Sequence, residues 1–162
     1  MYAGIAAFFI LAAIVAPVWG LSSSPDKGLN GKGKAEHLYL FEKDPGTWMI
    51  VEDGAWGKMT YLSDKGTFCF NGHNLTYGNH YALIYYPDPW PGTGLEVLGD
   101  GYADELGDIH IADTFDFGSI PIDGDTNSGA KIWLVLYEDQ DGSQMIGWNP
   151  SEYLFEYVLI NS

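Results

Sequence analysis

From residue 35 onward the chain alternates apolar and polar residues in short runs, which Gly, Asn, Asp and Pro interrupt. A period of two places successive side chains on opposite faces and is typical of β-strands. No stretch has the apolar spacing of an amphipathic helix. The predicted strands are 36–42, 47–52, 56–62, 67–72, 80–86, 95–103, 108–116, 130–138 and 153–160.

Several of these segments have one clean apolar face. In the run AKIWLVLYE, Ile132, Leu134 and Leu136 form an aliphatic face, whereas Lys131 and Trp133 belong to a face that is only half polar. Short strands at this spacing predict an all-β domain, a two-sheet antiparallel β-sandwich of immunoglobulin-like type. A jelly roll or a small β-barrel is the alternative architecture for the same pattern.

The pattern divides the chain into three parts. Residues 1–20 carry no charged side chain, and we interpret them as a signal peptide or a retained N-terminal membrane anchor. Residues 21–34 are rich in Ser, Gly and Lys and predict a flexible tether, which leaves residues 35–162 for one β-sandwich domain. We therefore expect an extracellular or cell-surface protein that is exported through its N-terminal hydrophobic signal.

The net charge of the chain limits the classes of partner that it can bind. The net charge is −15 and the chain contains no arginine, so nucleic acid and anionic lipid headgroups are unfavourable partners. We expect membrane contact only through the N-terminal segment, if that segment is uncleaved.

Cys69 is the only cysteine in the sequence, which excludes an intramolecular disulfide. Its place between Phe68 and Phe70 favours a packed thiol over a nucleophile.

Several blocks resemble a known domain family. The runs LYLFEKDPGTW, GAWGKMTY, YALIYYPDPWPG, GAKIWLVLYED and GWNPSEYLFEY are similar to an uncharacterised secreted β-sandwich domain of methanogenic archaea. The resemblance spans nearly all of the chain after the tether and implies an exported domain of the cell envelope. It implies no activity and no catalytic or ligand residue.

One acidic stretch has the composition of a cation site. Asp123, Asp125 and Asn127 occupy alternate positions in DGDTNSG, and oxygen ligands at this spacing can wrap a calcium ion. Asp139 and Asp141 are possible further ligands. The EF-hand pattern also requires a central Gly and a final Glu, which this stretch lacks, and a polar turn before the next strand explains the same residues.

No nucleophile, zinc, phosphate or dinucleotide motif is present, so we expect a non-enzymatic module. Trp90 and Trp148 are the predicted ligand-binding residues, because they lie in Pro-containing loops, although the Trp90 indole could instead fold back and cap the sandwich. Asn74 begins an NLT glycosylation sequon.

The expected function is contact with a surface protein or glycan, with calcium as a possible stabilising ion. Two alternatives remain open at this point: a secreted hydrolase that uses acidic residues, and a purely structural surface component.

Overall fold

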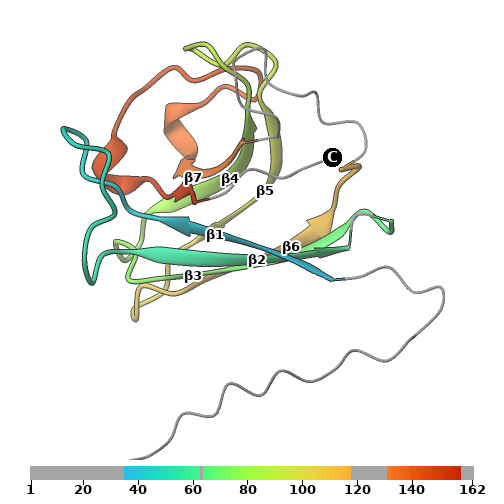
Figure 1. Ribbon diagram of the computed structural model, residues 1–162, viewed down its shortest axis with the longest axis horizontal. Helices are drawn as coiled ribbons and strands as arrows, with labels where there is room; N and C mark the ends of the chain where they lie inside the picture. Colours follow the sequence, from blue (N-terminus) through green and yellow to red (C-terminus); the bar gives the residue numbers. More distant parts are fainter. Residues whose placement is uncertain (1–34, 63, 118–130, 158–162) are drawn as a thin grey trace, which may run out of the picture. The chain divides into compact units, whose positions relative to one another are not determined.

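The structure is a computed structural model and describes residues 35–62, 64–117 and 131–157. Its strands form two antiparallel sheets, ordered β6-β3-β2-β1-β8 and β5-β4-β7 (Figure 1). The strands are β1 (Glu36–Phe41), β2 (Trp56–Leu62), β3 (Thr67–His73), β4 (His80–Tyr86), β5 (Glu96–Tyr102), β6 (Ile109–Thr114), β7 (Lys131–Leu136) and β8 (Phe155–Glu156). Helical structure in the described residues is limited to two short 3₁₀ turns, η1 (Tyr137–Asp139) and η2 (Pro150–Glu152).

This arrangement confirms the predicted all-β, two-sheet antiparallel sandwich, and the sheets do not close into a barrel. The end of the described chain passes from one sheet to the other. Leu154 bridges Leu134 of β7, and the next residue, Phe155, pairs with Phe41 of β1. Residues 154 and 155 therefore link an edge of one sheet to an edge of the other by backbone pairing.

The core between the sheets comes from the inward faces of both. Leu38, Leu40, Met59 and Phe70 contribute from the five-stranded sheet, and each is almost completely buried. The Phe70 ring lies over Gly57, where a β-carbon would come within 2.3 Å of it. A glycine in β2 thus makes the room that this large core ring occupies.

Two strands of the three-stranded sheet, β4 and β7, are buried on both faces, whereas β5 is partly exposed. Every residue of β7 is buried, and in β4 only His80 is partly exposed. The outer face includes Lys131 and Trp133, so this face, which the sequence shows to be only half polar, is covered as well. Met145 and Tyr153, from the chain that follows β7, are also buried. Figure 1 shows that segment, in orange and red, on the side of β4 and β7 away from β1–β3.

The predicted strand 47–52 was wrong, because this segment belongs to the loop between β1 and β2. Asp44 ends β-structure there: its Oδ1 accepts hydrogen bonds from the Gly46 and Thr47 backbone N–H groups at 3.1 and 2.8 Å. Such a turn competes with a strand ladder for the same donors. Only Ile50 of the expected strand pairs, in an isolated bridge with Lys43.

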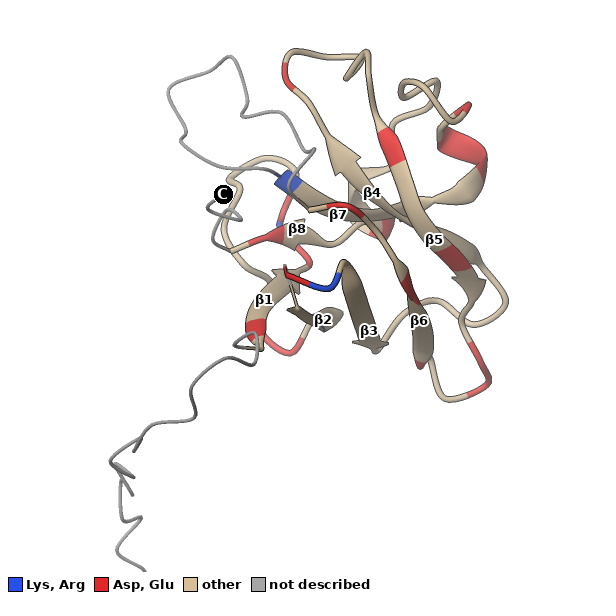
Figure 2. Ribbon diagram, turned by 90° about the vertical axis from the view of Figure 1, so that its right-hand side faces the viewer, with Lys and Arg blue, Asp and Glu red and all other residues tan. Residues whose placement is uncertain are grey.

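The predicted N-terminal signal or anchor (1–20) and tether (21–34) lie outside the described residues. Within the described ranges, no helix is both long enough and apolar enough to cross a membrane. Acidic residues are spread over both sheets and their loops, whereas basic residues are few (Figure 2).

We expect Gly57→Ala to destabilise the fold, because the new methyl group must displace the Phe70 ring or the strand beneath it. Overpacking of this kind costs about 1–3 kcal/mol, which urea denaturation measures directly. Gly101→Ala is the matched strand control, since its β-carbon would meet Ile109 at an ordinary 3.5 Å. Equal stabilities of the two variants would contradict the packing described here.

Candidate functional site

Three exposed tryptophans from three separate loops meet at one place on the surface. Trp48 comes from the β1–β2 loop, Trp90 from the β4–β5 loop and Trp148 from the segment after β7, with side chains 50%, 52% and 43% exposed. The Trp148 ring lies between the other two, with centroid distances of 6.3 Å to Trp48 and 5.4 Å to Trp90. We call these three residues the tryptophan cluster.

Buried rings support the tryptophan cluster from below. The Phe155 ring, which is 1% exposed, lies 5.0 Å from both Trp48 and Trp133 in edge-to-face geometry. Trp133 in turn stacks on Tyr86 at 3.8 Å and contacts Trp148 at 6.3 Å. Core rings adopt fixed packing positions, and the exposed indoles pack against them. The indoles therefore have defined positions on the surface.

A buried carboxylate holds the loop of Trp148. Asp139 Oδ2 accepts hydrogen bonds from the Tyr153 hydroxyl at 2.5 Å and from Asn149 Nδ2 at 2.8 Å. Its backbone oxygen accepts from the N–H groups of Ile146 and Gly147 at 2.8 and 3.1 Å. Burial, and then the bond to Asp139, raise the pKa of Tyr153. Asp139 thus fixes both ends of the short segment that carries Trp148.

Gly147, beside Trp148, is required by the same arrangement. A β-carbon at this position would lie 2.0 Å from Asp139 Oδ1, far inside any allowed contact. The close approach of backbone to carboxylate is possible only for glycine. The sequence GWN is therefore explained by how the loop docks on Asp139.

The Trp48 loop is organised by Asp44. Asp44 Oδ1 also accepts from the Thr47 hydroxyl at 2.8 Å, and the two bonds from Thr47 lower the pKa of Asp44. The Trp48 backbone N–H bonds the Asp44 carbonyl at 2.8 Å while its φ is 57°, in the left-handed region. Bulky residues rarely adopt this conformation, which costs about 1–3 kcal/mol and persists where neighbours impose it.

The Trp90 loop is tied to the segment after β7. The N–H of Met145 donates to the Pro91 carbonyl at 2.8 Å, and the N–H of Gly94 donates to the Ser143 carbonyl at 2.9 Å. Met145 is buried, which anchors this junction in the core. The loops of Trp90 and Trp148 are consequently held to each other by backbone hydrogen bonds as well as by their rings.

Two lysines, Lys131 and Lys43, are held by contacts with neighbouring groups. Lys131, at the start of β7, forms an ion pair with Asp88, and Lys43 Nζ donates to the backbone oxygen of Glu156 at 2.9 Å. Burial lowers the pKa of Lys131 and raises that of Glu156. These charged groups lie among the supports of the cluster, so the indoles themselves present an apolar surface.

The comparisons with known proteins add no relative. No protein-family model matches the chain, and no curated protein and no solved structure matches it. The similarity to a methanogen envelope domain therefore stays a prediction, and the site is argued from its geometry alone.

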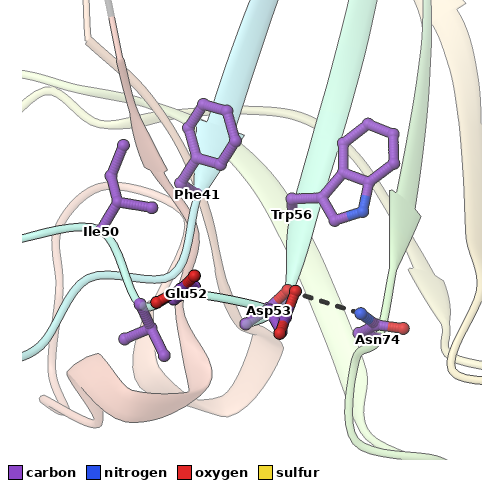
Figure 3. Close-up of a pocket in the computed structure, with 9 residues that line it drawn as sticks. Phe41, Ile50, Glu52, Asp53, Trp56 and Asn74 are labelled. Atoms are coloured by element: carbon purple, nitrogen blue, oxygen red, sulfur yellow. Dashed lines mark hydrogen bonds between the residues drawn. The ribbon is translucent and has the colours of Figure 1, made fainter. Parts of the chain in front are cut away.

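A second candidate site is a pocket of about 420 Å³ that is lined largely by residues 50–55 of the β1–β2 loop (Figure 3). Two aromatic rings, Phe41 and Trp56, stand over it, and the carboxylates of Glu52 and Asp53 lie below them in this view. Asn74 closes one side and donates through Nδ2 to the Gly54 carbonyl at 3.5 Å. The remaining lining residues are Ile50, Val51, Gly54 and Ala55.

The sequence nominated two of the three clustered tryptophans. The structure brings Trp90 and Trp148 together and exposes both, so the Trp90 indole does not cap the sandwich core. Trp48 was missed because its segment was assigned to a strand. The signal was present: the DPG turn directly before Trp48 resembles the Pro-containing contexts that singled out the other two.

The predicted calcium ligands are only partly described. Asp123, Asp125 and Asn127 lie outside the described residues. Asp139 is buried in the contacts given above, and Asp141 Oδ1 accepts from the backbone and hydroxyl of Ser143, which lowers the pKa of Asp141. Among the described residues no three acidic, His or Cys side chains gather as a metal site. Calcium binding stays a prediction.

The other nominated positions are placed as follows. Asn74 is exposed in the loop after β3, and its glycosylation stays a prediction. Cys69 meets His110 across β3 and β6, with 3.8 Å between Sγ and Nδ1. Asn71 Oδ1 lies 2.8 Å from the same Nδ1. In a catalytic triad the nucleophile and the orienting group contact different nitrogens of the histidine ring. Cys69 and Asn71 both contact Nδ1 of His110, so these three residues lack the geometry of a catalytic triad.

We expect Tyr153→Phe to destabilise the protein by about 1 kcal/mol at pH 7, because Asp139 then loses its buried hydroxyl donor. The raised pKa of Tyr153 makes this contribution depend on pH. It is fully present below the unfolded pKa of about 10 and is lost as pH rises above that value. Urea denaturation of parent and variant at pH 7 and at about pH 10.5 should show the difference shrinking; a constant difference would contradict this assignment.

Proposed function

We propose that the domain is a non-enzymatic binding module of an exported protein and that the tryptophan cluster is its contact surface for a partner protein. The observation that carries this proposal is the meeting of three half-exposed indoles from three loops. Each loop is tied down separately, by Asp139, by Asp44 or by backbone bonds to the neighbouring loop. A single exposed tryptophan needs no explanation, whereas a supported group of three marks an interaction site.

The composition of the surrounding surface favours a protein over a glycan. Met49, Ile50 and Ile146 follow or precede the clustered tryptophans in sequence, and they are 70%, 42% and 60% exposed. Aromatic residues and Met are enriched at the centre of protein interfaces, where charged residues are depleted. Sugar sites also need polar groups that converge on hydroxyls. Here the amide of Asn149 beside Trp148 is already bonded to Asp139.

Charge indicates what surrounds the apolar contact on the partner. The chain has a net charge of −15 and no arginine, and acidic side chains are spread over its strands and loops (Figure 2). Complementary potentials steer association and exclude wrong partners. We therefore expect a partner surface with aromatic or aliphatic side chains at its centre and lysine or arginine at its rim.

Peptides selected from a random display library on the purified chain test this proposal. We expect the selected peptides to combine aromatic and basic residues, and to lose about 2 kcal/mol of binding free energy, about thirtyfold in Kd, on Trp148→Ala. Titration calorimetry with one selected peptide measures the change. Trp148 is the residue to replace because its ring contacts both other members of the cluster.

Tyr102→Ala is the matched control, since Tyr102 is a 67% exposed aromatic residue on β5, outside the cluster. Its removal should leave the affinity unchanged. Equal losses in the two variants, or peptides that bind both variants as they bind the parent, would contradict the proposal. Binding of neutral oligosaccharides with the same dependence on Trp148 would replace the protein partner by a glycan.

A further inference from the structure

The pocket beside the β1–β2 loop has the chemistry of a cation site. Phe41 and Trp56 are directly paired in the antiparallel register of β1 and β2, so their side chains stand on the same face of the sheet. Figure 3 shows both rings at the pocket, one on each strand. The faces of aromatic rings attract cations, and tryptophan does so most strongly.

Trp56 is held in place by its neighbours. Its ring lies 4.7 Å from the imidazole of His73, and His73 Nδ1 is 2.8 Å from Asp108 Oδ1. The indole is nevertheless 36% exposed, so part of its surface remains available on the pocket side. A positioned and partly open ring requires little reorganisation when a ligand binds.

The carboxylates of Glu52 and Asp53 complete the site. Both residues are exposed, both line the pocket, and neither carboxylate forms a hydrogen bond or an ion pair with another described residue. Glu42, another acid of this loop, differs, because its Oε2 accepts a hydrogen bond from the Ala55 backbone N–H at 2.8 Å. Two acids thus remain uncommitted at the pocket, next to the two rings.

The rest of the lining is aliphatic. Ile50, Val51 and Ala55 contribute carbon surface to the pocket. A ligand that matches all of these groups has a positive head for the carboxylates and rings and a hydrocarbon stem for the aliphatic wall. Anionic and purely apolar ligands match only part of the pocket.

We propose that this pocket binds a primary ammonium group at the end of an alkyl chain, supplied by a lysine side chain of a polypeptide or by a free alkyldiamine. The inference does not rest on the proposed function of the tryptophan cluster, because none of the three clustered tryptophans lines the pocket, although both surfaces include Ile50 of the β1–β2 loop. It assigns a binding role to Phe41, Glu52, Asp53 and Trp56.

The test is a titration followed through the indole N–H signal of Trp56 in a proton–nitrogen NMR spectrum, which Trp56→Phe identifies. The probes are 1,5-diaminopentane, Nα-acetyl-lysine methylamide and its neutral counterpart Nα-acetyl-norleucine methylamide. We expect the first two to shift the Trp56 signal with saturation and the neutral probe to leave it in place. An equal response to the neutral probe would overturn the proposal.

Charge removal without a change of shape supplies the second arm. Glu52→Gln and Asp53→Asn should each weaken the binding of the capped lysine about fivefold, which corresponds to the loss of one partly exposed ion pair. Asp64→Asn removes the same charge from the exposed β2–β3 turn, beyond the end of β2 opposite Trp56, and should leave the affinity unchanged. Equal affinities of the parent and a double Glu52→Gln, Asp53→Asn variant would refute the site.

The probes also distinguish the source of the ammonium group and the alternative occupant. Tighter binding of the capped lysine indicates a polypeptide, and tighter binding of diaminopentane indicates a free diamine. A shift of the Trp56 signal by calcium chloride, together with no response to either amine, would replace the proposal by a metal site. Trp148→Ala should not affect these titrations, so failure of the tryptophan-cluster proposal would leave this result intact.

Discussion

A sheet that is apolar on both faces must be covered on both sides, and this constraint determines much of the structure. The five-stranded sheet covers one face of β4 and β7, in the usual manner of a sandwich. The other face carries Ile84, Tyr86 and Trp133, which are all buried. Left open, these side chains would expose a large apolar area to water. The chain after β7 and the β4–β5 loop supply the second cover.

The second cover explains why the tryptophan cluster lies where it does. A cover made of loops must satisfy its own backbone groups, and here Asp139 accepts the N–H groups of residues 146 and 147 while its carboxylate bonds Tyr153 and Asn149. The outer side of the same cover then carries Trp148 and, through the backbone bonds at Met145, the loop of Trp90. The structure that buries Trp133 therefore also positions the exposed indoles. Surface rings that are fixed before binding lose little entropy on contact with a partner.

The fold was largely predictable from the sequence, because period-two alternation reports strands that bury one face. Prediction from this alternation fails where the apolar residues of a segment lie in a loop. The run TWMIVE has strand composition but forms a loop, since Asp44 and Thr47, its first residue, form a turn where it begins. The continuous apolar run YALIYY at 81–86 belongs to a strand that is buried on both sides, and one-sided alternation does not predict the second cover that such a strand requires.

The candidate sites were less predictable than the fold. Pro-containing loops identified Trp90 and Trp148, but only tertiary packing brings Trp48 to them. The pocket beside the β1–β2 loop depends on the register that pairs Phe41 with Trp56 and on a turn within a segment that had been assigned to a strand. Sequence reports which side chains are available, whereas register and loop docking decide which of them meet.

The cover over the outer face of β4 and β7 holds three solvent-facing indoles in fixed positions. Nitrogen relaxation of the indole N–H groups of Trp48, Trp90 and Trp148 in the free protein tests it most directly. If the rings are held as described, all three groups should have order parameters close to those of a rigid backbone, about 0.85. Values below about 0.6 for these groups, beside a rigid Trp133, would show that the exposed rings move independently and would contradict a preformed contact surface.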